Sequence, residues 1–280
     1  MKIPLDQLLK NWRDRLAAAG IEGADAEAEI LYCELSCRRR AELAMLRHAD
    51  ADPAAAIRGE AIVARREKRE PLQYLLGNAP FREIELEVTP DVLIPRPETE
   101  LLVDFALKHL PSGGRLLDVG TGSGAIALAA AFERPDITVL ALDVSPAALA
   151  VAERNAKRLK LAERVEFRAS HLLAALAPGE TFDLIAANLP YIAEEDYAGL
   201  QAEVRDHEPK LALTAADGGL ALVLELARQA PPHLKPGGRI IVEIGEGQAE
   251  RLTGILRQSY REVGVIRDYN RIDRHVFASK

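Results

Sequence analysis

Three alternating glycines and an aspartate further along the chain are the pattern in this sequence that most directly indicates chemistry. Residues 118–124 are Asp-Val-Gly-Thr-Gly-Ser-Gly, between an expected strand and an expected helix. Such glycines let the backbone turn sharply and approach a ligand closely, where a Cβ would clash. Asp143 ends the next expected strand, and a carboxylate there can accept both hydroxyls of a ribose. The pattern predicts a nucleoside-containing cofactor; the alternative is a glycine-rich turn followed by an aspartate that caps a helix.

The spacing of the glycines narrows the type of cofactor. It is G-x-G-x-G rather than the G-x-G-x-x-G of dinucleotide-binding folds, and no G-K-[ST] follows that would indicate a triphosphate. Asp118 would repel a pyrophosphate, but it suits the ammonium and sulfonium groups of S-adenosylmethionine. The loop resembles the first motif of class I methyltransferases, and Asp143 resembles their ribose-binding acid. The resemblance implies S-adenosyl-L-methionine as cofactor, S-adenosyl-L-homocysteine as product, and these cofactor-binding residues: Asp118, Gly120, Thr121, Gly122, Ser123, Gly124 and Asp143.

A second pattern, Asn188-Leu189-Pro190-Tyr191, ends the apolar run 184–187. By itself it could be a strand end and a turn, because Asn and Pro both favour turns. Asn-x-Pro-Tyr also resembles the [DN]-P-P-[YFW] motif of methyltransferases that act on planar, sp²-bonded nitrogens. In that interpretation the Asn188 carbonyl and a nearby backbone carbonyl accept both N–H hydrogens, and Tyr191 supplies a flat wall. We therefore expect Asn188, Pro190 and Tyr191 to be catalytic, Asn188 to Tyr191 to bind substrate, and Asn188 to contact the cofactor as well.

Leu189 departs from the motif, which usually has a proline at this position. A leucine keeps the backbone carbonyl that the chemistry needs. N-L-P-Y also occurs in adenine-N6 methyltransferases of ribosomal RNA. The motif therefore predicts a nitrogen methyltransferase without choosing the acceptor.

The elements that must position these residues change in character along the chain. Up to about residue 70 apolar stripes predict helices, and Asp52-Pro53 is a start signal for one of them. Residues 81–88 alternate, which predicts a half-buried strand that turns at 89–91 into a hairpin with 92–94. From residue 101 strands and helices alternate, which implies a mostly parallel sheet with its ligand site at the carboxyl ends of the strands. Strands are expected over 115–119, 137–142, 165–168, 182–187, 239–243, 263–266 and 275–278.

Further motifs point to one family. Residues 94–100 (Ile-Pro-Arg-Pro-Glu-Thr-Glu) resemble the I-P-R-P-E-T-E signature of the HemK/PrmC family, the release factor glutamine methyltransferases. Residues 71–77 resemble the P-x-Q-Y-[IL]-x-G stretch of that family. Further matches are 207–213 (His-Glu-Pro-Lys-Leu-Ala-Leu), Glu243-Ile244-Gly245 with Gln248, and Arg267-Asp268 with Ile272-Asp273-Arg274.

The resemblance implies an α/β fold, that of class I S-adenosylmethionine-dependent methyltransferases, with a Rossmann-like, mostly parallel seven-stranded sheet. It also implies a five-helix N-terminal domain and a connecting β-hairpin. We expect a helical substrate-docking domain over 1–75, a hairpin linker over 76–97 and the catalytic domain over 98–280. The implied activity is methyl transfer to the side-chain amide nitrogen (N5) of glutamine in the Gly-Gly-Gln loop of peptide chain release factors. Where the family usually has an acid and an aromatic residue, this chain has Ser170 and His171, and we expect Ser170 to bond the adenine amino group and His171 to pack by the ring.

Three alternatives remain at this point. An adenine-N6 methyltransferase of DNA or RNA would share both motifs, and so would the glutamine methyltransferase of a ribosomal protein, although that sister family typically lacks P-E-T-E. A protein that only senses S-adenosylmethionine would share the loop but would have no use for 188–191.

Charge and composition bear on partners and location. The net charge is −7 and there is no basic, aromatic-rich stripe, so we expect no direct binding of nucleic acid. Basic runs at 38–40 and 65–69 are either solvated helix faces or a docking face for an acidic partner such as a release factor. No apolar run approaches the roughly 20 residues that span a bilayer. We expect a cytoplasmic enzyme without a metal, with Cys33 and Cys37 as small core residues in a reducing compartment.

Overall fold

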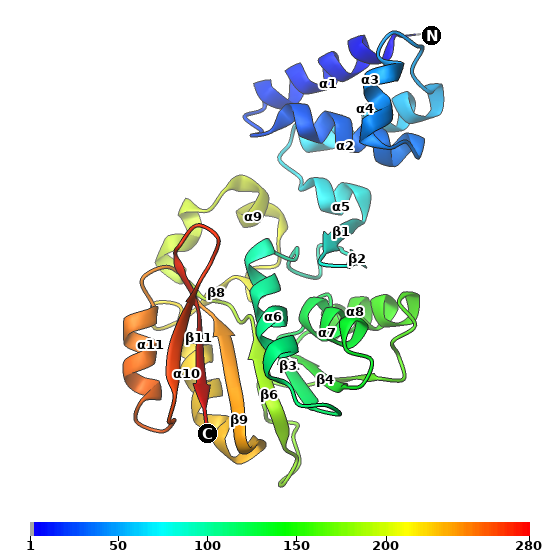
Figure 1. Cartoon of the computed structure of the whole chain (residues 1–280). Helices are drawn as coiled ribbons and strands as arrows, with labels where there is room; N and C mark the ends of the chain where they lie inside the picture. The colour runs from blue at the N-terminus through cyan, green and yellow to red at the C-terminus, as the bar shows by residue number, and fades with distance from the viewer. Residues whose placement is uncertain (1–2) are drawn as a thin grey trace. The chain divides into compact units, whose positions relative to one another are not determined.

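The chain forms a helical unit and an α/β unit (Figure 1). The computed structural model describes residues 3–280. The helical unit holds the chain up to Gly77 together with Gln201–His207, and the α/β unit holds Asn78–Leu200 and Glu208–Lys280. The domain boundaries expected at residues 75 and 97 remain predictions. The predicted domains did not include Gln201–His207 in the helical unit, although this segment packs with it.

The first unit is helical up to about residue 70, as the apolar stripes predict, and it contains further helices that no stripe predicted. The helices of the unit are α1 (Leu5–Ala18), α2 (Ala24–Ser36), α3 (Arg40–Leu46), α4 (Pro53–Arg66), α5 (Leu72–Leu76) and α9 (Ala202–His207). Helix α4 starts where the sequence predicts, because the Asp52 carboxylate accepts hydrogen bonds from the N–H groups of Ala54 and Ala55 at 2.7 and 2.9 Å. Pro53, the first residue of the helix, has no N–H to leave unsatisfied.

Trp12 is the centre of the core of the helical unit. Its side chain is fully buried (0 % exposed), and its indole N–H donates to Glu60 Oε1 at 2.7 Å. Gly59 of α4 makes this packing possible, since a Cβ there would lie 2.1 Å from Trp12 Cη2. Any side chain at residue 59 would therefore displace the indole ring or the helix.

The basic run 65–69 is divided between the interior and the surface of this unit, with Arg66 buried and Arg65 and Lys68 exposed. Arg66 is only 6 % exposed, and its guanidinium bonds both oxygens of Glu27, at 2.8 and 3.0 Å, and Glu203 Oε1 at 3.1 Å. Arg69 bonds the other oxygen of Glu203 at 2.6 Å. Arg66 and Arg69 are therefore held in ion pairs within the unit, while Arg65 and Lys68 remain exposed, and a docking role for them stays a prediction.

The cysteines differ from one another. Cys33 is half-buried and packs against the core of the helical unit. Cys37 is exposed and ends α2 with a φ of 53°. The expectation that both are core residues is wrong for Cys37.

A seven-stranded sheet forms the centre of the α/β unit (Figure 1). Its strands are β3 (Arg115–Val119), β4 (Thr138–Asp143), β5 (Val165–Ala169), β6 (Phe182–Ala187), β9 (Leu234–Glu243), β10 (Val263–Arg267) and β11 (Asp273–Ser279). The spatial order is β10-β11-β9-β6-β3-β4-β5. Strand β11 runs antiparallel to both of its neighbours, β10 and β9, and all the other neighbouring pairs are parallel. This confirms the predicted class I methyltransferase architecture, in which β6 pairs directly with β3.

The side chains of the sheet alternate between two apolar layers. Leu116, Leu184 and Ile241 face a layer that includes residues of α6 (Glu100–His109), α7 (Ala125–Glu133) and α8 (Pro146–Arg158). Leu117, Ile185 and Ile240 face a layer that includes α10 (Ala221–Gln229) and α11 (Ala249–Leu256). Helices therefore cover both faces, and the carboxyl ends of the parallel strands remain for a site.

The hairpin lies earlier than the alternation predicts. Strand β1 (Asn78–Phe81) pairs with β2 (Ile84–Glu87), so the turn falls within the run 81–88. Arg82 adopts the left-handed conformation (φ 50°), while its guanidinium bonds Glu133 and Asp104 at 2.6 and 2.7 Å. The single long strand over 81–88 is wrong. A turn does lie at 89–92, where Val92 N donates to Thr89 O at 3.0 Å, but 92–94 form no strand, so this turn closes no hairpin.

Short elements complete the unit. They are the 3₁₀ helices η1 (Pro97–Thr99), η2 (Glu194–Gly199), η3 (Lys210–Ala212) and η4 (Pro231–His233), and the paired strands β7 (Ile192–Ala193) and β8 (Thr214–Ala215). Among the helices described for residues 3–280, none combines the length and the apolarity that a membrane span requires.

Candidate active site

A cavity of about 230 Å³ lies at the carboxyl ends of β3, β4, β5 and β6. Most of the residues singled out in the sequence line it: Gly120, Thr121, Gly122, Ser123, Asp143, Ser170, His171, Asn188, Leu189 and Pro190. Three of them do not line it: Asp118, Gly124 and Tyr191. The two motifs thus meet in one cavity, at the position that parallel sheets favour for ligands.

The glycine loop makes a tight turn between β3 and α7. Gly120, Gly122 and Gly124 have φ values of 77°, 56° and 87°, a region that side chains with a Cβ rarely adopt. The N–H groups of Gly120 and Thr121 both donate to Leu142 O, at 2.8 and 3.0 Å, which ties the loop to β4. A Cβ at Gly122 would meet nothing within 4 Å, so the loop leaves open space beside its backbone.

Asp118 holds this loop through hydrogen bonds on its buried side. Its side chain is completely buried, and its Oδ2 accepts hydrogen bonds from Thr121 Oγ1 at 2.6 Å and from Ala127 N at 3.2 Å. Its Oδ1 has no hydrogen-bond partner in the described protein. Burial raises the pKa of this carboxyl to about 7, against the hydrogen bonds that lower it. Asp118 does not line the cavity, and its hydrogen bonds hold the glycine loop. Its expected contact with the cofactor stays a prediction.

Asp143 lies on the cavity wall at the end of β4. Its Oδ2 accepts a hydrogen bond from Gly122 N and its Oδ1 one from Ser145 N, both at 2.9 Å. Burial raises the pKa of Asp143, and these backbone donors oppose the shift. Each oxygen retains acceptor capacity, so the carboxylate could bond the two hydroxyls of a ribose.

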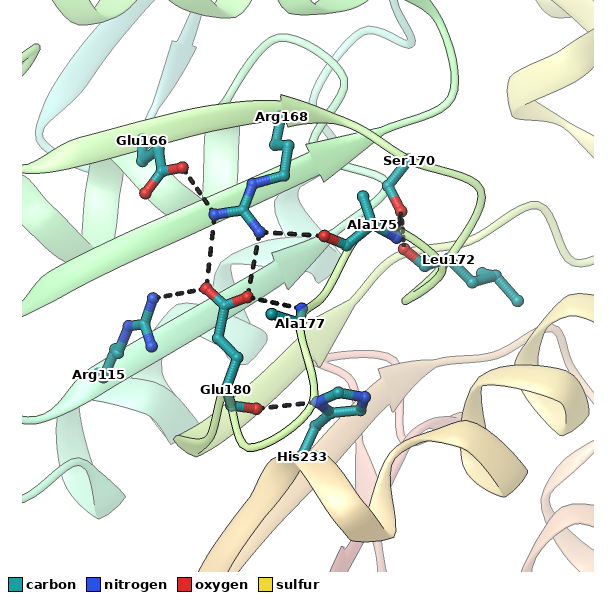
Figure 2. A network of polar contacts seen from close by, with 9 residues as sticks. All are labelled: Arg115, Glu166, Arg168, Ser170, Leu172, Ala175, Ala177, Glu180 and His233. Carbon is teal, nitrogen blue, oxygen red and sulfur yellow. Dashed lines mark hydrogen bonds and ion pairs between the residues drawn. The ribbon is translucent and has the colours of Figure 1, made fainter.

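Ser170 and His171 begin the loop after β5. The Ser170 hydroxyl donates to Leu172 O at 2.7 Å and accepts from Ala175 N at 3.1 Å (Figure 2). Its hydrogen is therefore already committed to the loop, which leaves only acceptor capacity for a ligand. His171 is exposed and lines the cavity. The cavity wall here is held mainly by local hydrogen bonds.

Figure 2 shows how the far end of this loop is held, with Glu180 between Arg115 and Arg168. The ion pairs are 2.9 Å (Arg115 Nη2 to Glu180 Oε1) and 3.1 Å (Arg168 Nη1 to Glu180 Oε2). Burial opposes ionisation, but hydrogen bonds from Arg168, Ala177 and Arg115 lower the pKa of Glu180. His233 Nδ1 contacts Glu180 O at 2.8 Å. This network fixes the loop between β5 and β6 to the body of the sheet.

Asn188 follows β6 directly, beside the glycine loop. Its Nδ2 donates to Thr99 Oγ1 at 2.9 Å, and Thr99 Oγ1 in turn donates to Glu243 Oε2 at 2.7 Å. Leu189 is buried, and its Cδ2 would lie 2.9 Å from a Cβ at Gly120. Asn188 thus presents its amide at the cavity while Leu189 packs under the turn of the glycine loop.

Tyr191 bonds Glu243 instead of lining the cavity. Its hydroxyl donates to Glu243 Oε1 at 3.2 Å. Burial and the Glu243 carboxylate raise the pKa of the Tyr191 phenol, so the hydroxyl keeps its proton. The expectation of a flat aromatic wall beside the substrate remains a prediction.

Gln248 clamps the segment that carries Tyr191. Its Nε2 donates to Tyr191 O and Gly218 O at 2.9 and 2.8 Å, and its Oε1 accepts from Gly245 N at 2.8 Å. Gly219 lies against the same carbonyl, because a Cβ there would be 1.9 Å from Tyr191 O. The side chain of Gln248 therefore joins three loops at the carboxyl edge of the sheet.

Arg96 lines the cavity and is paired with the buried Glu208. Arg96, a lining residue, makes an ion pair with Glu208 Oε1, while Glu208 Oε2 accepts from Ile94 N at 3.3 Å. Leu211 also lines the cavity, although it is 65 % exposed. An apolar, accessible side chain beside a cavity is suited to contact a protein substrate.

Four residues that organise this site had no role predicted from the sequence, namely Arg96, Thr99, Glu243 and Gln248. All four lie in the family motifs 94–100 and 243–248, so a signal was present, but the chemistry of the residues alone did not specify their contacts. Within residues 3–280 no cluster of three or more His, Cys, Asp or Glu side chains is suited to hold a metal ion.

Comparisons with known proteins agree with this geometry. Residues 7–77 match the family described as the PrmC N-terminal domain, and residues 110–267 match a methyltransferase domain family. A release factor glutamine methyltransferase of Nitratidesulfovibrio vulgaris is 38 % identical over 280 residues, covering 99 % of this chain and 95 % of that protein. The protein of the same name from Bordetella pertussis is 44 % identical over 265 residues, covering 94 % and 96 %.

Among solved structures, a methyltransferase from Pyrococcus furiosus shares the fold. Its TM-score is 0.54 at 21 % identity, over 70 % of this chain and 88 % of that one. The two domain matches and the two nearly full-length relatives show that the chain belongs to the release factor glutamine methyltransferase family.

Proposed function

We propose that this protein transfers a methyl group from S-adenosyl-L-methionine to the N5 side-chain amide nitrogen of glutamine in the Gly-Gly-Gln loop of peptide chain release factors. The observation that carries the proposal is the shared cavity of the Gly120–Gly124 loop, Asp143 and Asn188, in a chain of this family.

The residues present fit the cofactor. The loop leaves open space at Gly122, where a Cβ would meet nothing within 4 Å, and Asp143 faces the same cavity. In the proposed complex, Asp143 would hold the ribose hydroxyls. The backbone of the glycine loop would face the amino acid part of the cofactor. Ser170 and His171 border the adenine end. The bound cofactor supplies a methyl group made electrophilic by a sulfonium.

Asn188 would orient the substrate amide. An amide nitrogen is a poor nucleophile because its lone pair is delocalised into the carbonyl. The Asn188 carbonyl oxygen and the backbone carbonyl of Leu189 would accept the two N–H hydrogens and hold the nitrogen in line with the methyl group. Positioning and charge complementarity of this kind account for large rate accelerations without a covalent intermediate.

The substrate assignment follows the relatives. The two proteins reported above are both named for glutamine methylation of release factors, and their similarity extends over more than 90 % of this chain. Release factors belong to translation, so we also propose a cytoplasmic location. The exposed Leu211 and the cation Arg96 at the cavity would meet the peptide that carries the glutamine.

Mass spectrometry of the substrate tests the proposal. Purified protein and cofactor should add one methyl group to the glutamine of the Gly-Gly-Gln peptide when the intact release factor is the substrate. The control is the same release factor with that glutamine changed to alanine, which should take up no label. Transfer of labelled methyl to DNA or RNA, or to no substrate at all, would contradict the proposed function.

A further inference from the structure

The hydrogen bonds behind Asn188 form a chain with a direction. Glu243 accepts at both carboxylate oxygens, from Thr99 Oγ1 at 2.7 Å and from Tyr191 Oη at 3.2 Å. The Tyr191 phenol keeps its proton because burial and Glu243 raise its pKa, so it can only donate to this carboxylate. Glu243 therefore serves as an acceptor for both hydroxyls.

The orientation of the Thr99 hydroxyl determines which group of Asn188 can face it. A threonine hydroxyl has one hydrogen and two lone pairs, and the hydrogen of Thr99 is directed at Glu243. The neighbour on the other side, 2.9 Å away, must then be a donor, which is the Asn188 NH₂ group. Thr99 and Glu243 are both buried, so no bulk water competes for these positions.

The orientation of the Asn188 amide follows. With Nδ2 held by Thr99, Oδ1 points away from Thr99, and Asn188 lines the cavity. A flipped amide would set its oxygen against the Thr99 oxygen, two acceptors facing each other, and the buried Thr99 oxygen would lose the donor that it accepts from. The flip is therefore disfavoured by the contacts of Thr99 rather than by those of Asn188 itself.

We propose that Thr99 and Glu243 are positioning residues that fix the Asn188 amide with its oxygen towards the substrate nitrogen. The inference rests on the proposed function for its catalytic meaning, but the orientation itself is a property of the free protein. It selects substrates whose reacting nitrogen carries hydrogens to donate, as a primary amide does.

Two substitutions disturb the donor–acceptor order of these hydrogen bonds while keeping nearly the same side-chain volume. Thr99→Val deletes the hydroxyl, so both orientations of the Asn188 amide become accessible. Glu243→Gln replaces one of the two acceptor oxygens by an NH₂ donor. Where that NH₂ faces Thr99, the hydroxyl of Thr99 turns towards Asn188 and the chain is reversed, so the single orientation of the Asn188 amide is lost. Thr99→Ser keeps the hydroxyl and is the matched control.

Kinetics on the release factor provide the first measurement. We expect Thr99→Val to lower kcat about tenfold, and Glu243→Gln to lower it at least as much. The KM for the release factor and the Kd of S-adenosylhomocysteine should change less than about threefold, and Thr99→Ser should stay within about threefold of wild type in kcat. If both Thr99→Val and Glu243→Gln keep the wild-type kcat, the inference is wrong.

The Asn188→Asp background separates orientation from simple packing. An aspartate sets an oxygen against Thr99 in either orientation, so Thr99 gives it no favoured direction, and Thr99→Val should cost much less there than in the wild type. An equal cost in both backgrounds would show that Thr99 only fills space.

A spectroscopic measurement is independent of the substrate. In ¹⁵N-labelled protein, the side-chain NH₂ of Asn188 should be protected from solvent exchange in the wild type and in Thr99→Ser, and unprotected in Thr99→Val. An unprotected NH₂ in the wild type would overturn the inference. If the wild type methylates no release factor but the NH₂ is protected, the proposed function fails and the orientation stands.

Discussion

The two ends of the cavity are built in different ways. At the cofactor end, Asp143 is held by the N–H groups of Gly122 and Ser145, and the glycine loop by Leu142 O. These are mainly backbone hydrogen bonds between neighbouring strand ends. At the acceptor end, Asn188 depends on Thr99, 89 residues away in the sequence, and Thr99 depends on Glu243, 144 residues away.

The cofactor end is therefore determined mainly by the fold, whereas the acceptor end is determined by particular side chains of this sequence. Backbone donors and a strand-end carboxylate recur wherever the fold positions a nucleoside, so the cofactor end needs little from the rest of the chain. The acceptor end requires particular side chains from three distant segments to agree in direction. Changes at the cofactor end should therefore act on ligand affinity, and changes at the acceptor end on the rate of transfer.

Asn188→Ala should have the largest effect. Removal of a preorganised acceptor that acts mostly in the transition state typically costs about 10²–10³ in kcat. S-adenosylhomocysteine should still bind within a few-fold by calorimetry, because the glycine loop and Asp143 are unchanged. Asn188→Asp keeps shape and acceptor capacity and should retain more activity than alanine; equal losses would mean that Asn188 is only a turn residue.

Gly219→Ala should slow transfer by about a hundredfold, because misplacement of a reacting group by about 1 Å can cost that much. The new Cβ would lie 1.9 Å from Tyr191 O and would push the 188–191 segment away from its clamp. The control is Gly218→Ala, where the nearest atom to a new Cβ is Arg251 Nη1 at 4.0 Å. Steady-state kinetics should show a loss of kcat in the first variant only.

Asp143→Ala should weaken cofactor binding without a comparable effect at the acceptor end. Each lost charge-assisted hydrogen bond to ribose contributes about 1.5–3 kcal/mol, so the Kd of S-adenosylhomocysteine should rise at least about tenfold. At saturating cofactor, much of kcat should return. A Kd equal to that of the wild type in calorimetric titration would remove Asp143 from the site.

Asp118→Asn should have the smallest effect and should change how stability depends on pH. The folded state holds the pKa of Asp118 at about 7, above the ordinary value of 3.8. Between these values the folded state keeps a proton that the unfolded state has lost, so the contribution to stability falls as pH rises through this window. The asparagine variant is always neutral, so urea unfolding at pH 5 and pH 8 should show a smaller decline than in the wild type. Parallel pH profiles would contradict the buried, protonated carboxyl.

The same contrast explains what the sequence could predict. Strands β3 and β6 occupy the ranges that their apolar runs predicted, and the glycine loop and Asp143 meet at one cavity. The signals for these features are local. The turn at Arg82 was missed because it depends on Glu133 and Asp104, which no local pattern connects to it. The contacts of Thr99 and Gln248 were missed for the same reason: each is decided by residues from a distant part of the chain.

The membership of α9 in the helical unit has a consequence for the order in which the chain is made. Arg66 and Arg69 need Glu203, yet the ribosome synthesises Glu203 long after it has completed the helices up to Gly77. At about 5–20 residues per second, the interval is on the order of 6–25 s. Of the two carboxylates that bond Arg66, only Glu27 has been synthesised during this time. The N-terminal unit is thus the first to be translated but cannot be the first to be finished.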